Sequence, residues 1–338
     1  MSPITYKDAG VNIDEGNRAV QLIKAVLAEN NQGGGEIGRF GGMLPFPQGM
    51  EDPYLISSTD GVGTKLRIAL MAGIYDTVGQ DLVNHCVNDI LVQGARPLYF
   101  MDYFATGKLK AETLAEVVKG LSKACGENGC RLLGGETAEM PGFYGEEDFD
   151  LAGFITGAAE GPHILDGSRV KAGDLVVGLP STGLHTNGYS LARKILFEKL
   201  GWSVETLLPG TGKSVGELLL AVHRSYYHQL YPLVQADRLH ALAHITGGGV
   251  FENIPRVLPK DLNVRIRTTW PVPELFNLLV REGGLDSHEA YRTFNMGIGM
   301  VALIDQRELS LWENDSSLKP FFLMGEVVPG EGRVEMEK

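Results

Sequence analysis

Segments patterned as strands alternate with amphipathic helices along this 338-residue chain, and this alternation restricts its fold most. In the N-terminal half we expect helices over 14–29, 65–72, 81–94 and 111–129, and strands over 54–58, 97–105, 130–135 and 149–159. In the C-terminal half we expect strands over 174–180 and 241–246, and helices over 187–201, 215–235 and 247–258. Strands that alternate with helices in both halves predict an α/β or α+β protein.

A cluster of turn-forming residues at 160–173, "EGPHILDGSRVKAG", interrupts this alternation. A chain of this length is long enough for about two domains. We therefore predict one domain over 1–168 and a second over 169–338.

Composition excludes several classes of partner. The net charge of −12 argues against nucleic acid, whose binding needs a basic face. No apolar run approaches the roughly 18 residues of a membrane helix, and the first ten residues do not have the pattern of a signal peptide. Cys86, Cys125 and Cys130 are odd in number and lack the C-x-x-C spacing, which favours a reducing cytoplasm over a disulfide framework or a zinc site.

The stretch "SSTDGVGTK", 57–65, resembles a phosphate-binding loop without matching the P-loop pattern. The glycines at 61 and 63 would let backbone N–H groups approach phosphate oxygens, and Lys65 would add a point charge. Together with Thr64 and Asp60, they are predicted to contact a nucleotide. Asp60 taken alone is most simply a turn residue.

The helix predicted over 81–94 has an unusual polar face. One arc of about 140° collects five residues that contain no Lys, Arg or Glu: Asp81, Asn84, His85, Asn88 and Asp89. A solvated surface is the simple interpretation, but the missing Lys, Arg and Glu favour a polar cleft, with Asn88 near the nucleotide.

Carboxylates that converge on such a cleft need a cation. Two of them 4 Å apart repel by about 4 kcal/mol at an effective dielectric constant of 20. Hard oxygen ligands without cysteine or paired histidine suit Mg²⁺. Asp60, Asp81 and Asp89 are thus candidate metal ligands. Glu136 in "GGETAEMPG" is either a solvated loop acid or a further ligand, as is Glu139.

Two glycine loops in the C-terminal half each precede a predicted helix. They are "STGLHTNGYSL", 181–191, and "HITGGGVFENIP", 244–255. Backbone N–H groups at a helix N-terminus form an anion site, so the two loops predict a phosphorylated substrate in addition to the nucleotide. His185 and His244 lie inside these loops. The loop with six glycines between 33 and 42 is either a disordered surface loop or a lid over the ligand.

Eight segments resemble, in order and spacing, the phosphoribosylformylglycinamidine cyclo-ligase family, the aminoimidazole ribonucleotide synthetases of purine biosynthesis. They are "YKDAGVNID", "SSTDGVGTKL", "DLVNHCVNDILVQGA", "YFATGKL", "GGETAEMPGFY", "LHTNGYSLARKIL", "HITGGGVFENIPRVLP" and "YRTFNMGIGM". The resemblance implies that ATP drives ring closure of formylglycinamidine ribonucleotide to aminoimidazole ribonucleotide, ADP and phosphate. It also implies a homodimer in which the N-terminal sheets form a shared barrel near ATP, beside a C-terminal α/β sandwich.

The resemblance also assigns roles to residues. Asp60 and Asp89 match the family's metal-coordinating acids, Lys65 matches the basic residue of the same loop, and Asp81 and Glu136 match less certain positions. The presumed substrate side corresponds to His185, Asn187, Thr246, Gly247, Gly248 and Gly249. His85 replaces the usual Met, and Thr186 the usual Ser. His244 stands where related superfamily enzymes carry an Asp.

The chemistry can be predicted from the reacting groups. An amide oxygen is a poor leaving group, and the site loops offer no covalent nucleophile, so ATP must activate the substrate directly. We expect the formyl oxygen to attack the γ-phosphate and form an iminophosphate, with Lys65 stabilising the transferring charge. The ribose-bearing amidine nitrogen then attacks the formyl carbon and phosphate leaves, with His185 as a candidate proton relay.

Three alternatives compete with this interpretation. Another ATP-using enzyme of the superfamily, a selenophosphate synthetase or a thiamine-phosphate kinase, lacks the pair "GGETAEMPG" and "HTNGYSL". A dinucleotide-binding oxidoreductase would need G-x-G-x-x-G after a strand, whereas "GVGTKL" lacks the third glycine and follows Asp60. A non-catalytic nucleotide-binding module would show no ATP turnover.

Overall fold

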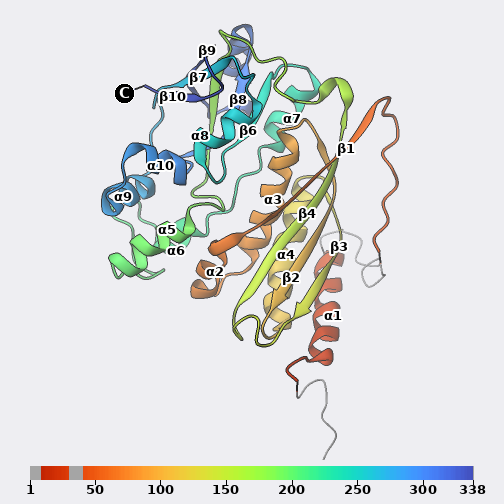
Figure 1. Ribbon diagram of the computed structural model, residues 1–338. Coiled ribbons are helices and arrows are strands. Elements are labelled where there is room, and N and C mark those ends of the chain that lie inside the picture. Colours follow the sequence, from red (N-terminus) through yellow and green to blue (C-terminus); the bar gives the residue numbers. More distant parts are fainter. Residues whose placement is uncertain (1–8, 30–40, 338) are drawn as a thin grey trace, which may run out of the picture.

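The computed structural model describes residues 9–29 and 41–337 and contains two sheets (Figure 1). The N-terminal sheet has the strand order β1–β4–β2–β3. Its strands are β1 Pro53–Gly61, β2 Arg96–Thr106, β3 Arg131–Glu139 and β4 Phe149–Glu160. Strand β4 runs antiparallel to β1 and β2, whereas β2 and β3 are parallel, so the sheet is mixed.

Four helices accompany this sheet: α1 Ile13–Glu29, α2 Leu66–Ala72, α3 Asp76–Leu91 and α4 Ala111–Glu127. Helices α3 and α4 lie side by side against one face, and α1 packs along α4 (Figure 1). A Cβ on Gly120 of α4 would lie 1.9 Å from the carbonyl oxygen of Asp76 on α3. Only glycine permits this close backbone approach, which brings α4 tightly against α3.

The C-terminal sheet has six strands in the order β10–β7–β9–β5–β8–β6. They are β5 Leu175–Pro180, β6 Ala241–His244, β7 Leu262–Ile266, β8 Ile298–Ile304, β9 Phe322–Pro329 and β10 Val334–Met336. Neighbours are antiparallel except for β10 and β7. The helices are α5 Tyr189–Arg193, α6 Val215–Leu219, α7 Tyr227–Gln235, α8 Gly249–Asn253, α9 Glu274–Gly283, α10 Ser287–Thr293 and α11 Leu309–Asn314. The predicted two-domain α/β architecture is confirmed.

The prediction of one long helix over 215–235 is wrong. Helix α6 ends at Leu219 and α7 begins at Tyr227, and the residues between them are not helical. Side chains of α3 hydrogen bond with the backbone of this connection instead: Asp81 accepts from the His223 N–H at 2.7 Å, and Asn84 donates to the His223 carbonyl at 2.8 Å. These bonds replace the helical ones, so tertiary contacts override a strong local pattern.

Two strand boundaries differ from the prediction in ways that affect the site. Strand β1 continues to Gly61, so Asp60 lies in a strand and not in a loop. Strand β3 continues to Glu139, and Glu136 therefore also lies in a strand. Most of the predicted lid, residues 33–40, falls outside the described residues. Within the described part of the chain, no helix is both long and apolar enough to cross a membrane.

Candidate active site between the domains

A pocket of about 560 Å³ lies between the two domains. Strand β1 contributes residues 57–60 to its wall, and α3 contributes Asp89. The C-terminal domain contributes His244 from β6, Thr246 from the following loop, and Arg256 from the turn after α8. Two segments distant in sequence, both predicted to carry function, therefore meet in one cavity.

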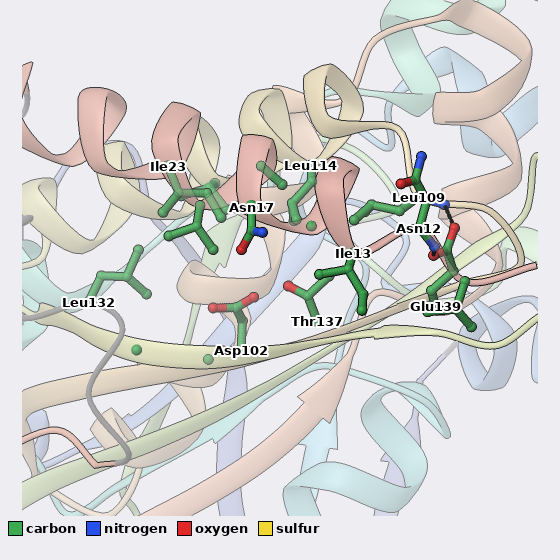
Figure 2. A pocket seen from close by; sticks show the side chains of 17 residues that line it. Asn12, Ile13, Asn17, Ile23, Asp102, Leu109, Leu114, Leu132, Thr137 and Glu139 are labelled. Atoms are coloured by element: carbon green, nitrogen blue, oxygen red, sulfur yellow. Dashed lines mark hydrogen bonds between the residues drawn. The ribbon is translucent and has the colours of Figure 1, made fainter. Parts of the chain in front are cut away.

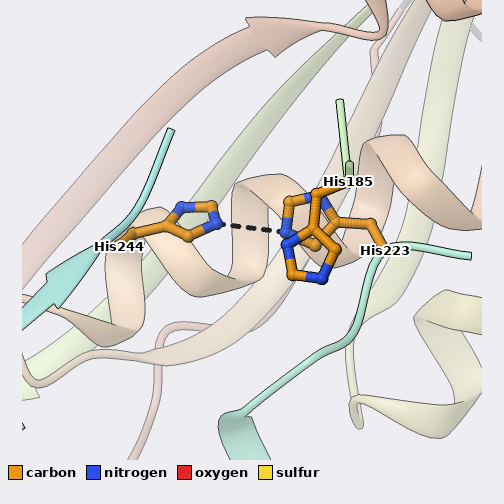
Figure 3. A group of neighbouring side chains, drawn as sticks. All are labelled: His185, His223 and His244. Carbon is orange, nitrogen blue, oxygen red and sulfur yellow. Dashed lines mark hydrogen bonds between the residues drawn. The ribbon is translucent and has the colours of Figure 1, made fainter. Parts of the chain in front are cut away.

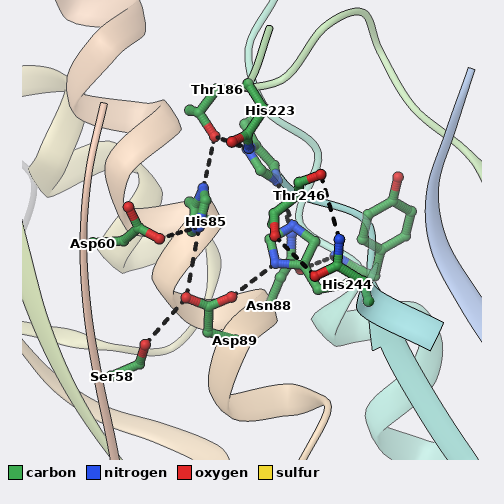
Figure 4. Close-up of polar contacts among 12 residues, drawn as sticks. Ser58, Asp60, His85, Asn88, Asp89, Thr186, His223, His244 and Thr246 are labelled. Atoms are coloured by element: carbon green, nitrogen blue, oxygen red, sulfur yellow. Dashed lines mark hydrogen bonds and ion pairs between the residues drawn. The ribbon is translucent and has the colours of Figure 1, made fainter. Parts of the chain in front are cut away.

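Asp60, Asp89 and His244 line the pocket, and the buried His85 contacts both carboxylates from behind its wall (Figure 4). His85 Nε2 lies 2.8 Å from Asp60 Oδ2 and 3.6 Å from Asp89 Oδ2. His244 Nδ1 lies 2.9 Å from Asp89 Oδ1, and the Ser58 hydroxyl donates to Asp89 Oδ2 at 3.1 Å. The expected convergence of Asp60 and Asp89 on a cleft agrees with this geometry. The expected absence of paired histidine does not, because β6 brings His244 beside α3.

The histidines control the ionisation of the two acids. Burial raises the pKa of Asp60, but the hydrogen bond and charge of His85 outweigh it and lower the pKa overall. For Asp89, burial is again the largest single influence and raises the pKa, but the hydrogen bond and charge of His244, together with the charge of His85, lower it overall. Both carboxylates are thus held in their charged form, as a cation site requires.

A buried layer supports the pocket from behind. Thr186 Oγ1 lies 2.7 Å from His85 Nδ1, and His223 Nε2 lies 3.0 Å from His244 Nε2. His185 stacks on His223 with ring centroids 3.9 Å apart (Figure 3). Burial lowers the pKa of His185 and His223 well below the usual range, so both are neutral. His185 is not among the described residues that line the pocket, which contrasts with its expected role as a proton relay.

Lys65 and Asp81 lie apart from the pocket and pair with each other. The ammonium is fully buried, 2.7 Å from Asp81 Oδ2, and it donates to the Ala221 carbonyl at 2.8 Å. In this arrangement Lys65 joins the two domains and reaches no pocket surface. Asp81 is equally enclosed, and Glu136 is exposed on β3.

The loop around Gly61 also differs from a phosphate cradle in its hydrogen bonding. The N–H of Gly61 donates to Asp60 Oδ1 at 2.7 Å, and that of Val62 donates to the Leu151 carbonyl at 3.3 Å. Gly63 has a φ of +67°, and the Thr64 hydroxyl lies 3.1 Å from Ser190 Oγ across the domain boundary. The first two amides therefore already have partners.

The loop from Thr246 to Gly249 is held in shape by Asn253. Asn253 Nδ2 donates to the carbonyls of Gly249 at 2.8 Å and Gly247 at 3.1 Å. Gly248 and Gly249 both have positive φ, at +89° and +57°. A Cβ on Gly247 would lie 3.3 Å from Asn187 Oδ1, so the two predicted glycine loops are adjacent.

Two residues of this region escaped sequence reasoning. Arg256 is the one Lys or Arg side chain among the described residues that line the pocket. The sequence feature that could have indicated it is its position shortly after the glycine loop, seven residues beyond Gly249. His223 was hidden within the apparent helix over 215–235. Asn88 also acts differently from expected: it bonds with the backbone of Arg224 and Tyr226 rather than facing a ligand.

A second pocket of about 500 Å³ lies within the N-terminal domain, between α1, α4 and β3 (Figure 2). Its walls are mostly apolar, with Asp102, Asn17 and Thr137 among the polar exceptions. Burial raises the pKa of Asp102 to about 7. Glu139 closes one end, where it accepts from the N–H groups of Asn12 and Leu109.

Comparison with known proteins first defines the class. Residues 46–159 match the model of the AIR synthase related protein, N-terminal domain, and residues 171–336 match that of the AIR synthase related protein, C-terminal domain. The chain is therefore an AIR synthase related protein. Its pocket lies between these two domains, with acids from the first and the loop residue Thr246 from the second.

Comparison with whole sequences is more specific. A phosphoribosylformylglycinamidine cyclo-ligase of Thermoanaerobacter sp. (strain X514) is 48% identical over 338 residues, covering 98% of this chain and 99% of that protein. One from Caldanaerobacter subterraneus subsp. tengcongensis is 49% identical over 334 residues, covering 97% and 99%. This chain belongs to the phosphoribosylformylglycinamidine cyclo-ligase family.

Solved structures with the same fold are more distant. The hydrogenase maturation protein HypE in complex with ATP aligns with a TM-score of 0.63 at 19% identity, covering 89% of this chain and 85% of that one. A thiamine-monophosphate kinase from Stenotrophomonas maltophilia K279a aligns with a TM-score of 0.64 at 14% identity, covering 95% and 96%. At this identity the likeness shows the fold alone.

Proposed function

We propose that the pocket between the domains is the active site for the activity of the family. That activity is the ATP-dependent ring closure of formylglycinamidine ribonucleotide to aminoimidazole ribonucleotide, an ATP-dependent ligase reaction of purine biosynthesis. The observation that carries the assignment is the meeting of Asp60 and Asp89 with Thr246 and Arg256 in one cavity. A ring closure driven by ATP needs a cation site and an anion site within reach of each other.

Asp60 and Asp89 are the residues that would hold Mg²⁺ with the ATP phosphates. They fit this role because both are ionised hard oxygen ligands at the pocket wall, with side chains 46% and 21% exposed. When bound, the metal neutralises phosphate charge. Asp81, Glu136 and Lys65, also predicted for this site, would need a rearranged structure to reach a nucleotide.

Arg256 is well placed to stabilise the transferring phosphoryl group, the role predicted for Lys65. A guanidinium can contact two phosphate oxygens at once. Thr246 lines the same cavity just before the N-terminus of α8. Together with the adjacent glycines 247–249, which have Asn187 beside them, it would take the ribose phosphate. The formyl oxygen would then attack the γ-phosphate, and the amidine nitrogen would close the ring.

A homodimer, a cytoplasmic location and the domain boundary at 168/169 belong to the same proposal. Support for the dimer comes from the face of the N-terminal sheet opposite α3, where Leu55 and Phe154 are 58% and 48% exposed. Phe154 on β4 is paired with Thr59 on β1 and with Met101 on β2, so the three strands share this face. A second sheet would cover it and close a barrel.

Isotope transfer tests the reaction. Substrate labelled with heavy oxygen at the formyl group should deliver the label to inorganic phosphate in a single turnover with ATP. Asp60→Asn and Asp89→Asn should each lower turnover at least tenfold and weaken its dependence on Mg²⁺, whereas Glu313→Gln, on the exposed side of α11, should not. Label released into water, or unchanged turnover of both variants at limiting Mg²⁺, would contradict the assignment.

A further inference from the structure

The hydrogen bonds of Asn88 determine which ring nitrogens of the histidines behind the pocket carry a hydrogen. Asn88 Oδ1 accepts from the Tyr226 N–H at 3.0 Å, and Asn88 Nδ2 donates to the Arg224 carbonyl at 2.8 Å, so the amide cannot be reversed. The same Nδ2 lies 3.2 Å from His223 Nε2. An amide nitrogen only donates, so His223 Nε2 is an acceptor and carries no hydrogen.

This assignment determines the orientation of His244. His223 Nε2 and His244 Nε2 are 3.0 Å apart, and since the first has no hydrogen, the second must donate. A neutral imidazole has one N–H, so His244 then points the lone pair of Nδ1 at Asp89 Oδ1, 2.9 Å away. Two electron-rich atoms at this distance require a positive charge between them, either a second proton or a metal cation.

His85 brings a second imidazole nitrogen to the same point (Figure 4). Its Nδ1 contacts the Thr186 hydroxyl at 2.7 Å, which turns Nε2 toward Asp60 and Asp89. Ligand atoms of His85, Asp89 and His244 all lie within 4.8 Å of one another. Tetrahedral Zn²⁺, with bonds of about 2.0–2.2 Å, places its ligand atoms about 3.3 Å apart. Thr186 and His223 bond to the far nitrogens, as outer partners of metal-bound histidines do.

Two other groups of candidate ligands in the described part of the chain fail this comparison. His185 and His223 are stacked with an angle of 22° between ring planes, so their in-plane lone pairs run side by side and do not converge (Figure 3). Asp174 and Asp305, grouped with His240, already share the ammonium of Lys171 at 2.9 and 2.7 Å.

We propose that His85, His244, Asp89 and Asp60 form a mixed nitrogen–oxygen site for a borderline divalent cation of the Zn²⁺ and Co²⁺ class. Imidazole ligands favour these ions over Mg²⁺. The inference deepens the proposed function because it shares Asp60 and Asp89 with the Mg²⁺–ATP site, and it makes Zn²⁺ a competitor of Mg²⁺ there. The site spans both domains, since His244 belongs to β6 and the other three residues to β1 and α3.

The test uses the full chain freed of metal, with Zn²⁺ followed by calorimetry and Co²⁺ by its visible absorption. We expect one Zn²⁺ per chain and the intense Co²⁺ bands of a four-coordinate nitrogen–oxygen site. His85→Met and His244→Asn should each weaken Zn²⁺ binding at least tenfold and abolish those bands. His240→Asn, which removes a histidine from the excluded aspartate group, is the matched control and should change neither. Thermal unfolding of each variant confirms that it is folded.

Three results would overturn the inference: no Zn²⁺ binding, binding lost only in His240→Asn, or Co²⁺ spectra of six-coordinate oxygen ligands unchanged by His85→Met. In the last case a second proton on His244 supplies the charge. Turnover with Mg²⁺ and ATP in metal-scrubbed buffer separates this inference from the proposed function. Normal turnover without Zn²⁺ binding would contradict only the proposed Zn²⁺ site. Zn²⁺ binding without turnover would contradict only the proposed activity.

Discussion

At the scale of single residues, burial decides which charged side chains can act on a ligand. Asp60 and Asp89 keep access to the pocket, whereas Lys65 and Asp81 neutralise each other inside the protein. Sequence places Lys65 five residues from Asp60, and nothing in that spacing reveals that the ammonium turns away. The two roles, phosphate contact and internal ion pair, predict different effects of mutation.

Lys65→Met should destabilise the fold by about 3–5 kcal/mol, because Asp81 would remain buried without its counterion. Urea unfolding measures this loss. The double variant Lys65→Met with Asp81→Asn should recover part of it, since an asparagine oxygen can still accept from His223 N–H. Lost turnover with an unchanged free energy of unfolding would instead support a phosphate contact.

Asp102 should make stability depend on pH. Its pKa of about 7 in the folded protein lies above the unfolded value of about 3.9, so folding favours the protonated form. That stability is fully present below about pH 4 and is lost as pH rises through about 7. Asp102→Asn should remove this pH dependence. At pH 8 its free energy of unfolding should be higher than that of the natural chain by on the order of 2 kcal/mol.

Unfolding curves in urea at several pH values between 5 and 8 check this expectation. Glu313→Gln, which changes an exposed acid on α11, serves as the control and should follow the natural chain. Parallel pH profiles for Asp102→Asn and the natural chain would show that Asp102 is ionised in the folded protein.

At the scale of elements, helix α3 organises the site because its faces bind different partners. Its apolar side packs on the N-terminal sheet, while Asp81, Asn84 and Asn88 bond to the backbone of 221–226. Asp89 lines the pocket, and His85 contacts Asp60 and Asp89 from behind the pocket wall. The polar arc was visible in the sequence. Its division between structure and site was not, because the partner segment, 221–226, lies more than 130 residues away along the chain.

In the glycine loop before α8, different glycines are expected to serve stability and substrate binding. A Cβ on Gly249 would lie 1.8 Å from the Tyr291 carbonyl of α10, at a φ of +57°. Gly249→Ala should therefore destabilise the protein by about 2–4 kcal/mol in thermal or urea unfolding.

Gly247 offers the matched comparison, because its nearest neighbour would be Asn187 Oδ1 at 3.3 Å and its φ is not positive. Gly247→Ala should leave unfolding nearly unchanged and weaken substrate binding measured by calorimetry. Equal loss of stability in both variants would argue that the loop is held less tightly by α10 than the structure indicates.

At the scale of the whole molecule, the two domains meet through buried polar contacts. The residues that the structure describes leave one face of the N-terminal sheet uncovered. Phe154→Asp places a charge at the centre of that face, between Thr59 and Met101. We expect light scattering to show a dimer for the natural chain and a monomer for this variant, because an unpaired charge is costly in an apolar interface. Lys119→Asp, on the exposed side of α4, is the control and should remain dimeric. A natural chain that is monomeric at all concentrations would refute the dimer.

The sequence by itself determined the fold class and the presence of two domains, and it marked Asp60 and Asp89 as candidate site residues, because periodicity and local motifs are properties of neighbouring residues. Tertiary structure alone decided that 220–226 is not helical, that Lys65 faces inward, and that His223 and His244 stand behind Asp89. Each of these depends on hydrogen bonds or charges supplied by the other domain. Local patterns cannot register such partners, since the energy of a buried polar group is set by what folding brings next to it.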